Sequence, residues 1–160
     1  MPTPQQFITD ALAPALGLLG PKCDTPKSRL QVLVSCLQES GLKDRQQVGG
    51  GPGHGLAQFE GGPLSATAQV LKHGYARTAA VCLARKVSCT RPAIHAALLT
   101  DDVLAAALAR VLLLTDAKPL PEIGDEDGAW DCYIRNWHPG KPDRKRFAKN
   151  YPIALQALGL

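Results

Sequence analysis

The sequence predicts one mainly α-helical domain that spans residues 1–160. Three observations carry this prediction. Apolar residues recur at helical spacing along most of the chain, the alternation typical of β-strands is not evident, and Thr-Pro or Asp steps typical of helix starts precede several of these segments. A chain of this length buries roughly two-thirds of its unfolded surface, so a core can form without disulfides or metal.

The first two helices are delimited by capping residues, proline and glycine. Thr-Pro-Gln-Gln at residues 3–6 combines an N-cap, a proline at the first helical position and a glutamine at the third, as in a capping box. This helix is expected to run to about Leu19 with a kink at Pro14. The second helix is expected to begin at Pro26 and to end at Gly41.

The remaining chain is expected to be helical outside its loops. Three helices are predicted near residues 63–73, 76–87 and 91–99. Three more helices follow. The first is apolar, is capped by residues 100–102 and runs through Leu114. The second carries an aromatic stripe from Trp130 to Trp137, and the third begins at Asp143 and is bent at Pro152. Residues 42–62 have room for a short hairpin, the one exception to the helical pattern.

The charge of the chain favours an anionic polymer over nucleic acid as a partner. The sequence has 18 Lys and Arg against 14 Asp and Glu, a net charge of +4. This mild excess suits a bacterial cell wall, whereas a nucleic-acid binder is expected to carry a dense basic stripe. We expect no membrane span, because no stretch approaches 18 consecutive apolar residues. We also expect no Sec signal, because the N-terminus lacks a basic region and a long apolar core.

Cysteine and histidine are dispersed along the chain. The five cysteines are odd in number and include no Cys-x-x-Cys pair, which predicts reduced thiols packed as small hydrophobic groups. The four histidines are equally scattered, so we expect no metal site. Cys36 is expected to pack rather than to act as a nucleophile, because no adjacent base can be named.

The stretch CLQESGLKDRQQVGGGPGHGLAQFE, residues 36–60, contains an acidic residue that packing alone does not require. The second helix is apolar on two faces, and Glu39 occupies its last turn beside apolar neighbours. Burial and the helix dipole both disfavour a carboxylate there and raise its pKa toward neutrality. A carboxyl group still protonated near pH 6 suits a general acid for glycosidic cleavage. The alternative is a solvated glutamate at a helix end.

The glycine-rich segment after this helix allows backbone to approach a ligand closely. Residues 49–53, Gly-Gly-Gly-Pro-Gly, cannot form a stable helix. One alternative is a flexible surface loop, and another is a phosphate-binding loop. The phosphate-binding alternative is disfavoured because no Gly-Lys-Ser/Thr follows the glycines.

Glu39-Ser40, the glycine-rich stretch and Gly-Leu-Ala-Gln-Phe at residues 55–59 together resemble the Glu-Ser … Gly-Leu-Met-Gln signature of soluble lytic transglycosylases and goose-type lysozymes. The resemblance implies a lysozyme-like domain in which the glycine-rich loop lies beside the active-site cleft and Glu39 is the catalytic acid. Glu60 falls where goose-type enzymes carry an aspartate, and it is a second catalytic candidate. The implied substrate-binding residues in this segment are Ser40, Gly55, Leu56, Gln58 and Phe59.

A second segment, residues 133–142, resembles a late Tyr-x-x-x-Trp-x-Pro-Gly segment of bacteriophage lysozyme-like and chitinase-like proteins. By this resemblance Tyr133 is the counterpart of a tyrosine that borders the cleft opposite the acid, and Asn136 is a further substrate-binding candidate. The sequence departs from the family pattern, because Ala-Tyr-Asn-Ala-Gly is absent and Asn136 comes three residues after Tyr133. The alternative for Tyr133 is a half-buried core tyrosine beside Trp130 and Trp137.

These resemblances imply cleavage of the bond between N-acetylmuramic acid and N-acetylglucosamine in peptidoglycan, with the glycan strand as partner and no cofactor. In a lytic transglycosylase Glu39 acts first as acid and then as base, whereas in a lysozyme Glu60 or Asp44 assists water. A chitinase- or chitosanase-like hydrolase and a non-catalytic virion component remain as alternatives.

Reduced cysteines and the missing signal are consistent with a bacteriophage product that is made in the host cytoplasm. Such a protein would reach the periplasmic cell wall through a holin or as part of the virion. In the virion, other virion proteins are expected as partners.

Overall fold

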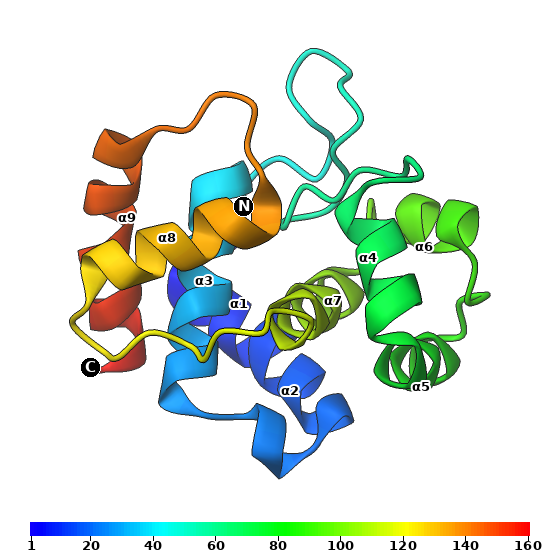
Figure 1. Ribbon diagram of the computed structural model, residues 1–160, viewed down its shortest axis with the longest axis horizontal. Coiled ribbons are helices and arrows are strands. Elements are labelled where there is room, and N and C mark those ends of the chain that lie inside the picture. Colours follow the sequence, from blue (N-terminus) through cyan, green and yellow to red (C-terminus); the bar gives the residue numbers. More distant parts are fainter.

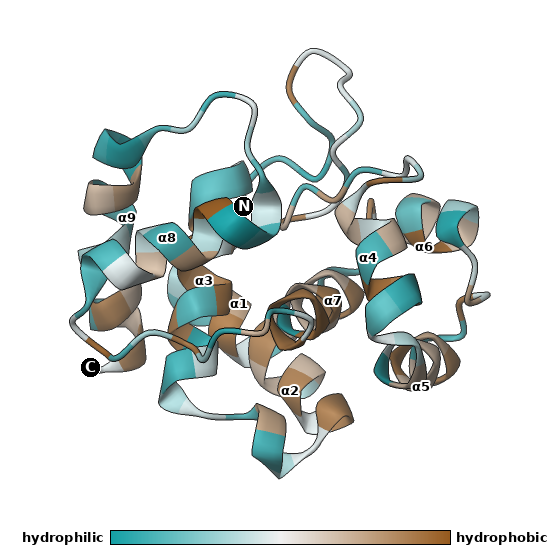
Figure 2. Cartoon of the chain, viewed as in Figure 1, coloured by the Kyte–Doolittle hydropathy of each residue, from teal (hydrophilic) through white to brown (hydrophobic).

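One apolar helix, α7 (Asp102–Leu114), runs through the centre of the computed structural model, which describes residues 1–160 (Figure 1). Every residue from Leu104 to Leu113 is buried, and α7 contacts the N-terminal helical segment, α3 (Pro26–Ser40) and two of the helices that follow the glycine-rich loop. Figure 2 shows apolar residues concentrated along this helix and on the sides of its neighbours. The predicted mainly α class is confirmed, because the chain forms helices and only isolated β-bridges.

The N-terminal helix is divided into three parts. α1 (Pro4–Phe7) begins with the predicted capping box, in which Gln6 N donates to Thr3 Oγ1 and Thr3 N to Gln6 Oε1. A π-helical turn, η1 (Ile8–Leu12), leads into α2 (Ala13–Leu19). Pro14 has no N–H to donate and its ring crowds the preceding turn, and the wider turn accommodates both effects. The departure from regular α-helix thus lies directly before Pro14, where the sequence predicts a kink.

Helix α3 (Pro26–Ser40) follows a short 3₁₀ turn, η2 (Pro21–Cys23). It is buried over most of its length and packs against α7, α8 (Glu126–Trp137) and α9 (Arg144–Leu158). It ends at Gly41, as predicted, and the left-handed backbone at that position (φ +61°) is one that glycine adopts without steric cost. In α9, Pro152 lies inside a helix that continues beyond it.

The helices after the glycine-rich loop form the other side of the molecule (Figure 1). They are α4 (Ala66–His73), α5 (Tyr75–Arg85) and α6 (Arg91–Ala97), each within a few residues of its expected range. The hairpin expected over residues 42–62 is reduced to isolated bridges between Gln46 and His54 and between His54 and Phe59. Positive φ angles at Gly49 and Gly50 turn the chain before longer strands can pair.

No helix in the chain has both the length and the apolar character required to cross a bilayer. All five cysteines are free thiols, and four of them are buried. Burial raises the pKa of the Cys36 thiol, and the nearby Glu39 carboxylate raises it further. This thiol is therefore kept in its unreactive, protonated form.

Candidate active site

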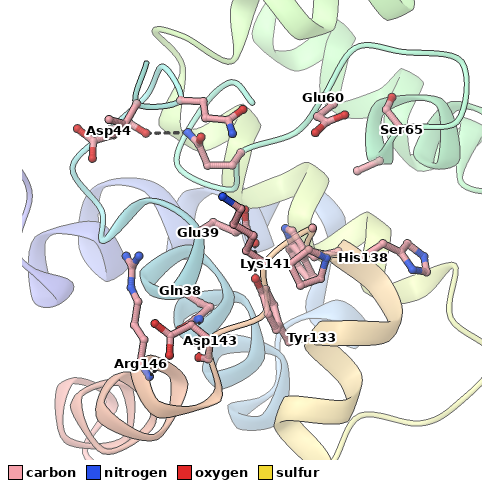
Figure 3. A pocket seen from close by; sticks show the side chains of 17 residues that line it. Gln38, Glu39, Asp44, Glu60, Ser65, Tyr133, His138, Lys141, Asp143 and Arg146 are labelled. Atoms are coloured by element: carbon pink, nitrogen blue, oxygen red, sulfur yellow. Dashed lines mark hydrogen bonds between the residues drawn. The ribbon is translucent and has the colours of Figure 1, made fainter. Parts of the chain in front are cut away.

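A cleft of about 560 Å³ lies where the end of α3 meets the glycine-rich loop and the segment between α8 and α9. Thirteen of its 17 lining residues are not hydrophobic, and this composition suits a polar ligand. The loop contributes Asp44, Gln47, Gln58 and Glu60, among others, and the opposite wall is built by Tyr133, Trp137 and the segment from His138 to Asp143. Glu39 lies between these walls (Figure 3).

Glu39 and Tyr133 come together across 94 residues of sequence. The Tyr133 hydroxyl donates a hydrogen bond of 2.5 Å to Glu39 Oε1. The tyrosine ring is itself buried and lies against the rings of Trp130, Trp137 and Phe147. This aromatic cluster fixes the hydroxyl in position, so the orientation of the Glu39 carboxyl is set by α3 on one side and by α8 on the other.

The surroundings of Glu39 favour its protonated form. Burial raises its pKa to about 7, an effect that Tyr133 and Arg146 partly oppose and that the negative charge of Glu60 increases. Burial also raises the pKa of Tyr133 far above its ordinary value, and the adjacent Glu39 carboxylate adds to this. Tyr133 therefore remains a hydrogen-bond donor at all pH values near neutrality.

Ser40 does not face the cleft. It is buried, and its hydroxyl donates to Leu56 O (2.7 Å) and to Cys36 O (3.1 Å) while it accepts a bond from Leu42 N. These bonds tie the end of α3 to the returning arm of the glycine-rich loop. Ser40, a substrate-binding candidate in the sequence, thus has its hydroxyl engaged within the protein and does not line the cleft.

Gly55, Leu56 and Phe59 are likewise buried and do not line the cleft. Gly55 has φ +74°, and a Cβ at this position would come within 2.9 Å of Leu98 O. A side chain at this position would collide with the segment after α6, so the close contact between the two segments requires glycine. The side chains of Leu56 and Phe59 pack into the core and Gly55 lies against Leu98, so these three residues anchor the loop and none of them lines the cleft.

Gln58 does line the cleft, together with both candidate second carboxylates, Glu60 and Asp44. Gln58 has a positive φ of +50°, and its Nε2 donates to Asp44 O (2.8 Å) and Gly55 O (2.9 Å). The Gln58 amide therefore joins the beginning of the loop, at Asp44, to its end, at Gly55, on the surface of the cleft. Glu60 is exposed, and its backbone carbonyl accepts a bond from Thr67 Oγ1.

Asn136 lies outside this cleft. It points into a neighbouring pocket, where its Nδ2 donates to Asp116 Oδ2 (2.9 Å) and to Cys132 O (2.8 Å). Asn136 lies one helical turn after Tyr133 on α8, and its side chain reaches the adjoining pocket rather than the cleft. The sequence therefore brings Glu39, Gln58, Glu60 and Tyr133 to one cleft and Asn136 to an adjoining one.

Several cleft residues were not expected from the sequence. Gln38 is buried beside Glu39, where its Nε2 donates to Asp143 O and its Oε1 accepts from Asn150 Nδ2, both at 3.0 Å. These bonds hold the segment between α8 and α9 against α3. The basic residues Lys141 and Arg146 also line the cleft. The signal in the sequence for this segment was the resemblance of residues 133–142, which include Lys141, to a late lysozyme-like segment; nothing in the sequence pointed to Gln38.

The chain contains no group of three or more His, Cys, Asp or Glu side chains arranged to hold a metal ion. Comparison with family models, curated proteins and solved structures found no match for this chain.

Proposed function

We propose that this protein is a glycosidase of the lysozyme or lytic transglycosylase type, and that it cleaves the bond between N-acetylmuramic acid and N-acetylglucosamine in peptidoglycan. The observation that carries the proposal is the Glu39 carboxyl, half-buried in a polar cleft, hydrogen-bonded to Tyr133 and with its pKa raised to about 7. Such a group is largely protonated near pH 6, which is the form that a general acid requires.

Glu39 would donate its proton to the glycosidic oxygen as the bond to the anomeric carbon breaks and an oxocarbenium-like centre forms. The Tyr133 hydroxyl would hold the resulting carboxylate. In a transglycosylase that carboxylate then takes the proton of the muramic C6 hydroxyl, whose oxygen closes a 1,6-anhydro ring. In a lysozyme, water adds instead, and Glu60 or Asp44 stabilises charge or accepts the proton of water.

The preference for peptidoglycan over chitin rests on two basic residues of one cleft wall. Lys141 and Arg146 line the cleft beside its carboxyl residues, and they suit contact with the carboxylates of peptidoglycan, which chitin does not carry. The proposal includes a bacteriophage origin, with action on the periplasmic wall in the virion or at lysis, and the five free cysteines are compatible with synthesis in a reducing cytoplasm.

The test is cleavage of purified peptidoglycan by the wild type and Glu39→Gln, with mass analysis of the released fragments. Glutamine keeps the shape of the side chain but has no proton to give, so we expect a loss of at least about a hundredfold. Glu122→Gln is the matched control, because Glu122 is exposed and lies outside the cleft. Glu39→Gln activity equal to that of the wild type would refute the proposal.

The same assay separates the two mechanisms through Glu60→Gln. A transglycosylase should keep its rate within about tenfold and release anhydro-muropeptides, since it activates no water. A lysozyme that relies on Glu60 should lose far more and release reducing ends. Efficient cleavage of chitin with none of peptidoglycan would instead identify a chitinase-like hydrolase.

A further inference from the structure

A second pocket of about 250 Å³ adjoins the cleft and shares His138 with it. It lies between α4, the end of α7 and α8, and its lining includes Gln69, Thr115, Asp116, Arg135 and Asn136. Sites for drug-sized molecules usually measure roughly 300–1,000 Å³, so this pocket fits one substituent of a larger ligand rather than a glycan chain. Figure 3 shows the His138 side chain directed away from Glu39.

The floor of this pocket is an ion pair, Arg135–Asp116, that carries no net charge. Asp116, whose side chain is only 8% exposed, accepts bonds from Arg135 Nε and Asn136 Nδ2, each at 2.9 Å, and from Lys118 N at 3.0 Å. Arg135 and Asp116 neutralise each other, and these bonds hold the pKa of the Asp116 carboxyl below its ordinary value despite burial. The pocket is therefore not built for a strongly charged group.

The groups left to meet a ligand are two side-chain amides and the imidazole of His138, which makes no hydrogen bond within the chain. Asn136 uses its Nδ2 for Asp116 and Cys132, while its Oδ1 receives no bond from the chain. Gln69, which is exposed, makes only one long contact, from Nε2 to Thr115 Oγ1 at 3.4 Å. Gln69 can thus both donate and accept, and Asn136 can accept. A secondary amide presents one N–H and one C=O, which this set complements.

We infer that this pocket is a subsite for a secondary amide carried by the substrate. The inference rests on the proposed function, because the cleft is taken to hold the glycan. Two parts of peptidoglycan present the required chemistry: the N-acetyl group of a further sugar and the amide bonds of the stem peptide. Either one would reach the pocket past His138 while the adjacent glycan occupies the cleft.

The test uses Glu39→Gln protein, which prevents turnover, and NMR of the Gln69 and Asn136 side-chain amides. The probes are an N-acetylglucosamine trimer, its de-N-acetylated counterpart and the free stem peptide. A shift of both amide signals with the acetylated trimer alone identifies an N-acetyl subsite, and a shift with the peptide identifies a stem-peptide subsite. If no probe shifts either signal, the inference is overturned.

A second variant measures the strength of the contact. Adding Gln69→Leu should raise the Kd of the recognised probe roughly fivefold to tenfold, the effect of about one hydrogen bond. Gln156→Leu, an exposed glutamine on α9 outside both pockets, should leave the Kd unchanged. An unchanged Kd for Gln69→Leu also overturns the subsite. These readouts do not depend on cleavage, so a failed Glu39→Gln activity test refutes the proposed function separately.

Discussion

Opposing forces act on the carboxyl group of Glu39. Burial and its position at the end of α3, where the helix dipole is negative, favour the neutral acid. The Tyr133 hydroxyl and the Arg146 guanidinium favour the carboxylate. Burial is the largest effect, and the pKa is raised from an ordinary value of 4.5 to about 7. A side chain that served packing alone would be more stable as an apolar residue, so Glu39 lowers the stability of the fold at neutral pH.

This cost predicts a pH-dependent stability difference between the wild type and Glu39→Gln. Between about pH 4.5 and 7 the folded protein holds a proton on Glu39 that the unfolded chain has lost. The wild-type free energy of unfolding therefore falls as pH rises through this window. At pH 8 we expect Glu39→Gln to be the more stable protein by an amount on the order of 2–3 kcal/mol, and at pH 4 the two should be equal.

Urea unfolding at a series of pH values measures this difference. Glu122→Gln serves as control, because that carboxyl is exposed and its surface ion pair with Lys27 should contribute less than about 1 kcal/mol at any pH. A Glu39→Gln difference that stays constant from pH 4 to 8 would show that Glu39 does not carry the raised pKa.

At the scale of elements, the glycine-rich loop is held on both of its flanks. Ser40 binds the carbonyl of Leu56 on one side. On the other, the rings of His54 and His95 stack in parallel with centroids 3.7 Å apart. His54 Nδ1 bonds to the His95 carbonyl, and His95 Nε2 bonds to Pro52 O, both at 2.8 Å. This stack anchors the loop to α6, and the loop thereby holds one wall of the cleft in place.

Removal of this stack should loosen the loop without unfolding the protein. In His95→Ala we expect roughly tenfold faster hydrogen exchange at the amides of Gln47 and Gly55, which bond to Gly53 O and Arg45 O within the loop. Amides of α7 should exchange at the wild-type rate. His73→Ala, an exposed histidine at the end of α4, is the control and should change neither set. Equal exchange of the loop amides in both variants would contradict an anchoring role for the stack.

At the scale of the whole molecule, α7 separates two groups of helices. α3, α8 and α9 lie on one side, and α4, α5 and α6 on the other (Figure 1). The cleft lies where the end of α3 and the segment after α8 face the loop and the start of α4. The two walls of the cleft therefore come from opposite sides of a shared core. Packing around α7 keeps these walls in their relative positions.

Truncation within α7 should destabilise the entire fold. Leu108 is fully buried in the core, and Leu108→Ala is expected to lower the free energy of unfolding by about 2–5 kcal/mol through lost burial and a residual cavity. Leu83→Ala, at a leucine that is 82% exposed on α5, should change it by less than about 0.5 kcal/mol. Urea unfolding at pH 7 measures both, and equal values for the two variants would contradict a central role for α7.

The sequence alone determined the helical class, most helix boundaries and the position of Glu39 in the last turn of a buried helix. These features depend on local chemistry: the Thr3 capping box, the end of α3 at Gly41 and the apolar spacing of α7 all act within one or two helical turns. Local patterns also indicated that the glycine-rich loop would lie near this glutamate, because only a few residues separate them.

A resemblance suggested that Tyr133 borders the cleft opposite Glu39, but only the tertiary structure shows the hydrogen bond that joins the two across 94 residues. Only the structure also shows that Gln38 bonds to the segment that carries Lys141. Local spacing did not reveal that Leu56 and Phe59 turn into the core or that Asn136 enters a separate pocket. Such directions follow from how whole helices pack against α7, and packing is set by contacts between residues far apart in the chain.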